Sequence, residues 1–152
     1  MRQWPSLVGF VVLAFAAGYV GSRFLPGDWY AGLAKPSFNP PNGVFAPVWS
    51  VLYLLMGIAA WRAWRTRGLD AAIALWLAQL ALNAAWSWLF FGRHLLAVAL
   101  VDIAVLLALI VATTIAFFRR DRAAGWMMVP YIAWVSFATV LNAALWHLNP
   151  AA

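Results

Sequence analysis

Residues 29–53, WYAGLAKPSFNPPNGVFAPVWSVLY, form the one long stretch of this chain that cannot be a continuous membrane-spanning helix. Prolines at positions 36, 40, 41 and 47 fix φ and remove backbone N–H donors. We therefore expect residues 35–41 to be extended and rich in turns, and a helix to begin near Pro47. The pattern predicts a structured lid, approximately residues 25–46, over a bundle of helices.

The remainder of the chain is strongly apolar. Of its 152 residues 66% are hydrophobic and 9% are charged, and the mean hydropathy is +0.86. Apolar runs cover approximately 7–24, 47–64, 71–91, 95–118 and 125–148, and each is close to the roughly 20 residues that cross a bilayer. The runs lack the alternation of barrel strands, and lipid cannot satisfy an open backbone. We predict an all-α integral membrane protein, a bundle of five transmembrane helices, with residues 1–152 as one membrane domain.

Basic residues cluster between the apolar runs, where orientation signals are expected. Seven lie on one side of the predicted membrane and three on the other: Arg2, Arg62, Arg65, Arg67, Arg119, Arg120 and Arg122 against Arg23, Lys35 and Arg93. This excess predicts a cytoplasmic N-terminus and a lid on the opposite face. We expect the bacterial plasma (inner) membrane rather than the outer membrane, and no nucleic-acid partner in spite of the formal charge of +6.

The first apolar run has two interpretations. A secretory signal peptide is the alternative for residues 1–21, but only Arg2 precedes an apolar run that is longer than usual for such a peptide. We therefore favour a first transmembrane helix. Its Gly9, Gly18 and Gly21 predict a small-residue face for close helix contact.

Polar and aromatic side chains recur at helical spacing in three of the runs. Two amides facing lipid would be costly, so the face with Gln79 and Asn83 should point into the bundle or a cavity. An interhelical hydrogen bond and contact with a ligand are the alternatives for Asn83, and the former is favoured for Gln79. We predict that three such helix faces meet to form an apolar, aromatic pocket that suits a flat ligand. The faces are Trp49, Tyr53 and Met56 in the second run; Gln79, Asn83 and Trp86 in the third; and Tyr131, Trp134, Ala138 and Asn142 in the fifth.

The opposite side of the third run carries a stripe of alanines, a pattern that permits close helix approach. This alanine stripe predicts either packing within the bundle or a homodimer seam, and it comprises Ala71, Ala74, Ala78, Ala81 and Ala85. Asp70 is the predicted N-cap of the same helix.

Conventional catalysis finds little support. The four acidic residues are scattered and no Glu is present. Asp102 lies about 10 Å inside the fourth run, where structural hydrogen bonding and ligand or proton chemistry are open alternatives. His94 and His147 fit ordinary interfacial histidines better than haem ligands. We predict no metal site and no required cofactor.

Several long motifs, in order, resemble the translocator protein family, also called tryptophan-rich sensory proteins or peripheral-type benzodiazepine receptors. They are WYAGLAKPSFNPP in the lid, VFAPVWSVLYLLMG, AQLALNAAWSWLFF, ALVD and PYIAWVSFATVLN. The resemblance implies a bacterial member of a five-helix family that binds porphyrins, sterols and isoquinoline or benzodiazepine-like ligands in a pocket closed by the lid.

Carried over residue by residue, the resemblance implies eight ligand-binding positions: Tyr30, Trp49, Tyr53, Asn83, Trp86, Trp134, Ala138 and Asn142. It also implies that Trp49 and Trp134 could serve light-dependent breakdown of protoporphyrin IX. The sterol-recognition pattern of animal members is incomplete, since Ala143 and His147 stand where a Tyr and an Arg are expected.

Three functional interpretations follow. The leading one is a receptor or transporter-like protein for porphyrins, with porphyrin as ligand rather than cofactor. The others are a photo-oxidative porphyrin-degrading enzyme, and a structural or partner-binding membrane protein that dimerises through the alanine stripe.

Overall fold

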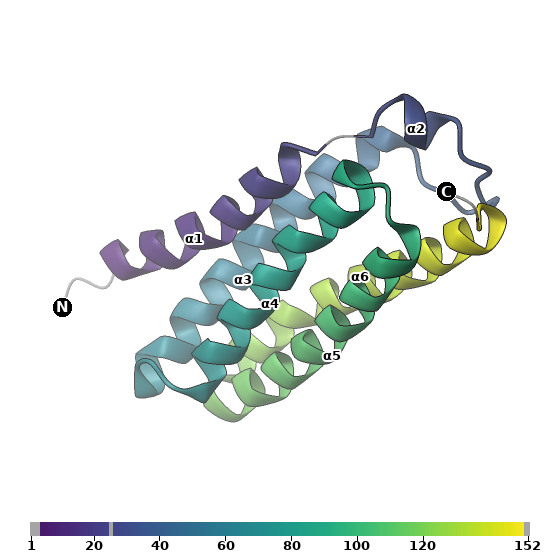
Figure 1. The fold of residues 1–152 in the computed structure, drawn as a ribbon. Helices are drawn as coiled ribbons and strands as arrows, with labels where there is room; N and C mark the ends of the chain where they lie inside the picture. The colour runs from purple at the N-terminus through teal and green to yellow at the C-terminus, as the bar shows by residue number, and fades with distance from the viewer. Residues whose placement is uncertain (1–3, 25, 151–152) are drawn as a thin grey trace.

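The computed structural model describes residues 4–24 and 26–150, and its regular elements are helices (Figure 1). They are α1 (Trp4–Ser22), α2 (Asp28–Ala31), the 3₁₀ turn η1 (Asn42–Val44), α3 (Phe45–Arg67), α4 (Ala71–Ser87), the π-helical turn η2 (Trp88–Gly92), α5 (Leu96–Arg120) and α6 (Arg122–Leu148). Five of these helices, counted with η1 and η2 as extensions of α3 and α4, are long and apolar enough to cross a membrane. The predicted five-helix membrane fold is confirmed.

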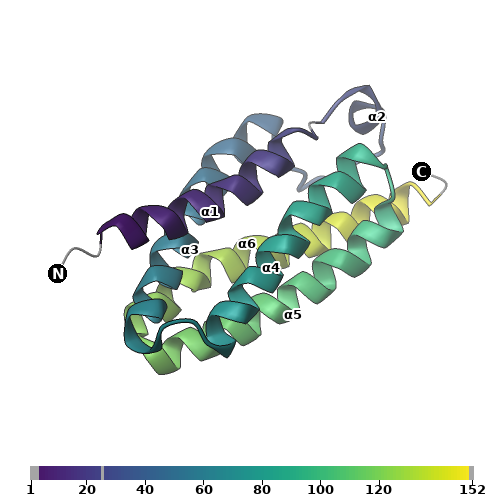
Figure 2. The ribbon, with the colours of Figure 1, turned by 60° about the vertical axis from the view of Figure 1, so that its left-hand side comes forward.

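The five long helices pack side by side as a ring. Following the contacts, α1 lies between α3 and α4, α6 lies between α3 and α5, and α4 and α5 close the ring (Figures 1 and 2). The short α2 belongs to the lid at one end of the bundle, and the C-terminal end of α6 lies close to it (Figure 1). The lid therefore lies at the end of the bundle where α1 ends, η1 begins and α6 ends.

The lid is fastened to the C-terminal end of α6 and to the α4–α5 connection. The Asn149 side chain accepts a hydrogen bond from the Ala34 amide at 3.0 Å and donates one to the Ala34 carbonyl at 2.8 Å. The Trp29 indole stacks on His94, with ring centroids 4.1 Å apart. His94 has a φ of 58° and follows η2 in the short turn to α5. These contacts hold both ends of α2 over the bundle.

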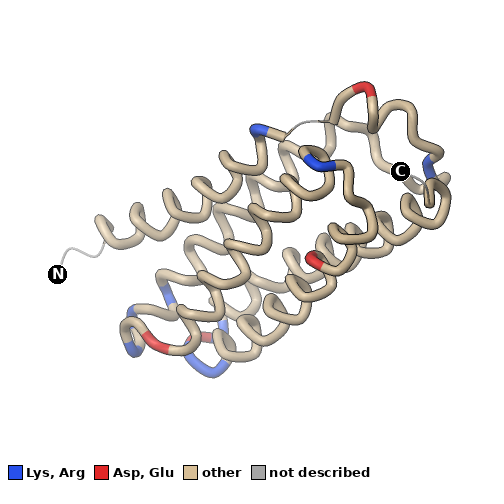
Figure 3. Tube along the Cα trace, viewed as in Figure 1, with Lys and Arg blue, Asp and Glu red and all other residues tan. Residues whose placement is uncertain are grey.

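The other end of the bundle carries most of the charge (Figure 3). Asp70 caps α4 as predicted, by accepting from the Ala72 and Ile73 amides, and Asp121 caps α6 in the same way. Each carboxylate also pairs with an arginine: Asp70 with Arg120 at 2.5 Å, and Asp121 with Arg62 at 2.9 Å. Arg2, which was predicted for this end, lies outside the described residues.

The Asp121 carboxyl has a lowered pKa. Its partial burial opposes this, but hydrogen bonds from Arg62 and from two backbone amides, together with the Arg62 charge, outweigh the effect of burial. Asp121 therefore stays ionised at neutral pH and tethers α3 to the start of α6.

Two of the three α1 glycines, Gly18 and Gly21, make the close helix contacts that the sequence predicted, and Gly57 in α3 adds another. A Cβ added to Gly57 in α3 would lie 2.7 Å from the Val11 Cα, so the backbones of α1 and α3 touch there. Gly18 and Gly21 pack against the side chains of Tyr53 and Ser87. Gly9 has nothing within 4 Å and makes no such contact, which corrects its expected role.

The alanine stripe faces away from the bundle. Ala71, Ala74, Ala78 and Ala81 are exposed, and Ala85 is half-buried. The alternative in which this stripe packs within the monomer is therefore wrong. The face of α4 that points inward carries Trp76, Gln79, Leu80 and Asn83 instead.

Gly57→Ala should destabilise the protein, because its new methyl group must displace the α1 backbone rather than a flexible side chain. Gly9→Ala is the matched control in α1 and should be neutral or slightly stabilising, since alanine favours a helix by up to about 1 kcal/mol over glycine. Thermal unfolding in detergent, followed by circular dichroism, measures both. Equal melting temperatures for the two variants would contradict the assigned α1–α3 contact.

Candidate functional site

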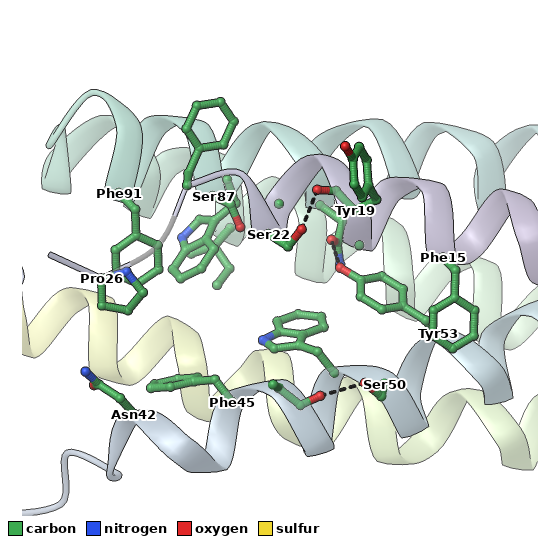
Figure 4. Close-up of a pocket in the computed structure, with 18 of the residues that line it drawn as sticks. Phe15, Tyr19, Ser22, Pro26, Asn42, Phe45, Ser50, Tyr53, Ser87 and Phe91 are labelled. Carbon is green, nitrogen blue, oxygen red and sulfur yellow. Dashed lines mark hydrogen bonds between the residues drawn. The ribbon is translucent and has the colours of Figure 1, made fainter.

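A cavity of about 630 Å³ lies between α1, α3 and α4 at the lid end of the bundle. Figure 4 shows Phe15, Tyr19 and Ser22 reaching it from α1, and Phe45, Ser50 and Tyr53 from α3. Its wall is mostly apolar and aromatic, and the full lining is Phe15, Gly18, Tyr19, Gly21, Ser22, Phe24, Pro26, Asn42, Phe45, Ala46, Trp49, Ser50, Tyr53, Asn83, Trp86, Ser87, Phe91, Ile103 and Leu106.

One wall of this cavity is fixed by a chain of hydrogen bonds that joins three helices. The Tyr53 hydroxyl donates to the Asn83 side-chain oxygen, the Asn83 amide donates to the Tyr131 hydroxyl, and Tyr131 donates to the Gln79 side-chain oxygen, each at 2.7 Å. All four residues are buried. Both amides therefore tie helices together, as expected for Gln79, and Asn83 also lines the cavity.

A second, much smaller cavity of about 20 Å³ lies directly beneath the lid. Tyr30 reaches it from α2, and Trp134, Ala138 and Asn142 reach it from α6. Four residues line both cavities and so form the partition between them: Phe45, Trp49, Trp86 and Phe91.

Trp49 is the centre of this partition. Its ring lies 5.5 Å from Tyr53, 6.2 Å from Tyr131 and 6.4 Å from Trp134, measured between centroids, and it meets the last two edge to face. Trp86 is held by a hydrogen bond from its indole nitrogen to the Asn142 side-chain oxygen at 3.0 Å, and Asn142 in turn donates to the Leu96 carbonyl. The partition thus consists of side chains. A hydrogen bond fixes Trp86, and ring contacts fix Trp49.

The eight predicted ligand positions fall into two groups. Tyr53 and Asn83 line the larger cavity, Trp49 and Trp86 line both, and Tyr30, Trp134, Ala138 and Asn142 line the smaller one. The predicted faces do converge beneath the lid, but Trp49 and its neighbours divide the space that a single pocket would occupy.

The smaller cavity contains a hydrogen-bond donor that lacks an acceptor. The Trp134 indole nitrogen is buried and has no partner among the described residues. A buried N–H without an acceptor is costly, so this position favours a guest that brings a carbonyl or carboxylate oxygen.

The lid lines the smaller cavity through Tyr30. Tyr30 is buried and its hydroxyl donates to the Asn39 side chain at 3.1 Å. Burial raises the pKa of the Tyr30 phenol, and the hydrogen bond to Asn39 opposes this in part. The Lys35 ammonium lies 5.0 Å above the Tyr30 ring. The Tyr30 phenol therefore remains protonated, and its hydrogen bond to Asn39 fixes its orientation within the lid.

The contribution of α1 was missed by sequence reasoning. Phe15, Gly18, Tyr19 and Ser22 recur at spacings of three and four, which does place them on one helix face. The sequence predicted only helix contact for α1, through its glycines, and assigned no α1 residue to the pocket. Ser50, Ser87 and Asn42 add hydroxyl and amide groups to the same cavity.

Other candidates lie elsewhere. Asp102 lines neither cavity, and one of its carboxylate oxygens is buried without a hydrogen-bond partner among the described residues. His94 is occupied by its stack on Trp29, and His147 is exposed near the end of α6.

These observations define a class, an α-helical membrane protein with an aromatic cavity beneath a proline-rich lid. Residues 10–147 match the TspO/MBR family, and the chain belongs to this family. It is 38% identical over 154 residues to the translocator protein of Homo sapiens, covering 96% of this chain and 91% of that protein. It is 41% identical over 156 residues to the tryptophan-rich protein TspO of Chlorobaculum tepidum, covering 98% and 99%.

A further relative is the tryptophan-rich sensory protein of Cereibacter sphaeroides, 39% identical over 147 residues, with 97% of this chain and 93% of that protein covered. The family membership that the sequence motifs predicted is confirmed.

Asn83→Leu should lower the free energy of unfolding by about 1–3 kcal/mol, because it leaves the buried Tyr53 and Tyr131 hydroxyls each short of a partner. Thr139→Val is the matched control, since the Thr139 hydroxyl donates only within α6, to the Val135 carbonyl. Detergent unfolding followed by circular dichroism compares the two. A loss no larger for Asn83→Leu than for the control would contradict a stabilising role for the hydrogen-bond chain.

Proposed function

We propose that this protein is a membrane receptor or transporter-like protein that binds porphyrins, such as protoporphyrin IX and haem-type tetrapyrroles, and related apolar ligands. The observation that carries the proposal is the larger cavity. Its volume of about 630 Å³ lies within the roughly 300–1,000 Å³ typical of small-molecule sites. Its walls are mainly aromatic and apolar, which suits a flat, apolar macrocycle.

The polar groups of the cavity suit the edge of such a ligand. Tyr53 and Asn83 lie in the wall, while Ser22, Ser50 and Asn42 are exposed and line the cavity near its opening. The Ser22 and Ser50 hydroxyls donate to the Tyr19 and Ala46 carbonyls of their own helices. Rotation of either hydroxyl, or the Asn42 amide, would supply a hydrogen bond to a carboxylate of the porphyrin. The names translocator protein and sensory protein, which relatives bear, agree with a transporter-like or receptor protein.

The smaller cavity takes part in this proposal through Trp49. A rotation of that indole away from Trp134 would join the two cavities, so that one ligand contacts Tyr30, Trp134, Ala138 and Asn142 as well. The unpartnered Trp134 N–H would then meet an acceptor on the ligand.

Titration of protoporphyrin IX into the purified protein, followed by tryptophan fluorescence, tests the proposal. Trp134→Ala combined with Asn83→Ala should weaken binding by about tenfold or more, because a buried aromatic contact and a buried polar contact are lost together. Trp4→Phe is the control, since Trp4 is 63% exposed and lines neither cavity. Equal affinity of the double variant and the wild type would reject this site.

A second candidate function is light-dependent degradation of the bound porphyrin. The observation that favours it is the direct contact between the Trp49 and Trp134 rings, 6.4 Å between centroids, at the partition of the two cavities. Both indoles would adjoin a bound macrocycle. An indole could then give an electron to the photoexcited porphyrin, with molecular oxygen as the final oxidant.

The porphyrin absorbance under illumination measures this activity. Trp49→Phe with Trp134→Phe should stop the bleaching while leaving an apolar wall of similar shape, and darkness or removal of oxygen should do the same for the wild type. Bleaching by the double variant at the wild-type rate would show that neither indole is the electron donor.

We also propose a bacterial plasma membrane location with the N-terminus in the cytoplasm. The arginine-rich end of α3, α5 and α6 supports this orientation (Figure 3). The chain has no cysteine, so a membrane-impermeant maleimide can report single introduced cysteines in intact spheroplasts. Gly43→Cys in the lid end should react at once, and Leu69→Cys only after permeabilisation; the reverse order would overturn the orientation.

The alanine stripe is exposed, so a homodimer formed through it stays a prediction. In the third functional interpretation, a structural or partner-binding protein, Ala78→Leu would abolish the dimer and porphyrin binding would not saturate. Saturable binding in the titration above separates that interpretation from the receptor.

A further inference from the structure

The corner where α5 turns into α6 combines two free cations with an exposed apolar strip. Arg119 and Arg122 are both exposed there. Phe118, Trp126 and Ile115 lie beside them on the same two helices. We call these five residues the α5–α6 corner.

The acidic groups at this end of the bundle are already engaged elsewhere. Asp70 pairs with Arg120 and Asp121 pairs with Arg62. Within residues 4–24 and 26–150, no carboxylate pairs with Arg119 or Arg122. Arg65 differs from them, since its guanidinium lies 4.5 Å above the Trp61 ring. The corner therefore carries positive charge that the protein leaves without a carboxylate.

Arg122 stands in an unfavourable place for a cation. It is the first residue of α6, where the helix dipole is positive and favours anions. Asp121 compensates in part by capping the Ala123 and Ala124 amides, but its charge is shared with Arg62. An anion from outside the chain would stabilise this arrangement.

The apolar half of the corner consists of two exposed side chains, Trp126 and Ile115, and the half-buried Phe118. Trp126 is 62% exposed and Ile115 is 50% exposed. The Phe118 ring meets Trp126 edge to face at 5.4 Å, and it covers Gly125 so closely that an added Cβ would lie 2.3 Å from the ring. Trp126 follows Arg122 by four residues and Ile115 precedes Arg119 by four. On each helix the exposed apolar side chain therefore lies one turn farther into the membrane-spanning part than the arginine.

We propose that the α5–α6 corner binds one anionic phospholipid. The phosphate lies between the Arg119 and Arg122 guanidiniums, which suit it through charge-assisted, bidentate hydrogen bonds. An acyl chain follows the strip formed by Trp126, Phe118 and Ile115 toward the middle of the membrane. A lipid fits better than a soluble phosphate compound, because the strip continues directly into the membrane-spanning parts of α5 and α6.

Native mass spectrometry of the full chain in a neutral detergent tests the proposal without a charged membrane surface. Phosphatidylglycerol and phosphatidylcholine with identical acyl chains are added separately. The wild type should retain phosphatidylglycerol preferentially. Arg119→Gln with Arg122→Gln should lower that retention about tenfold or more, since charge-assisted contacts are lost. The matched control, Arg65→Gln with Arg67→Gln, removes the same charge from the same end and should retain the lipid.

Quenching of tryptophan fluorescence by phosphatidylglycerol with brominated acyl chains gives an independent reading. Trp126→Phe should remove the quenching that phosphatidylglycerol causes in excess of brominated phosphatidylcholine. Equal retention of the two lipids by the wild type would overturn the proposal, as would equal losses in both arginine pairs. Displacement of the lipid by inorganic phosphate at the same concentration would also overturn it, because the site would then bind phosphate alone.

Discussion

One chain of hydrogen bonds holds the centre of this bundle together. It runs from Tyr53 in α3 through Asn83 in α4 and Tyr131 in α6 to Gln79. Apolar side chains gain little from contact with one another when lipid is the alternative, so packing and interhelical hydrogen bonds must set the register of such helices. Because three helices share this chain, the positions of Trp49, one turn before Tyr53, and of Trp134, one turn after Tyr131, follow from it.

The ion pairs and polar caps that connect the helices are unevenly distributed along the bundle. At the arginine-rich end, Asp70 and Asp121 each cap one helix and pair with an arginine from another. At the lid end, the cavity is bounded mainly by rings and by the glycine-containing face of α1. The end that would exchange a ligand is therefore the end with fewer ionic constraints, and the opposite end keeps the helices aligned.

The sequence predicted the elements of the site better than their arrangement. Helical spacing identified the inward faces with Asn83 and Trp134. The cost of placing an amide against lipid indicated that Asn83 points inward, and it left an interhelical hydrogen bond and a ligand contact as alternatives. Spacing states which residues share a face but not which helix that face meets. This is why the α1 residues Phe15 and Tyr19 escaped notice. It is also why the partition at Trp49 could not be foreseen, since a side-chain rotamer depends on neighbours that are distant in sequence.

The clamp between Asn149 and Ala34 joins residues 115 positions apart in the chain. Ala34 belongs to the first quarter of the sequence, and Asn149 follows the last residue of α6. Because the ribosome synthesises the N-terminal part of a chain first, the lid emerges from the ribosome before Asn149 has been synthesised. The Asn149 clamp can form only after α6 has been inserted, so the lid gains this second fastening only when the five-helix bundle is complete.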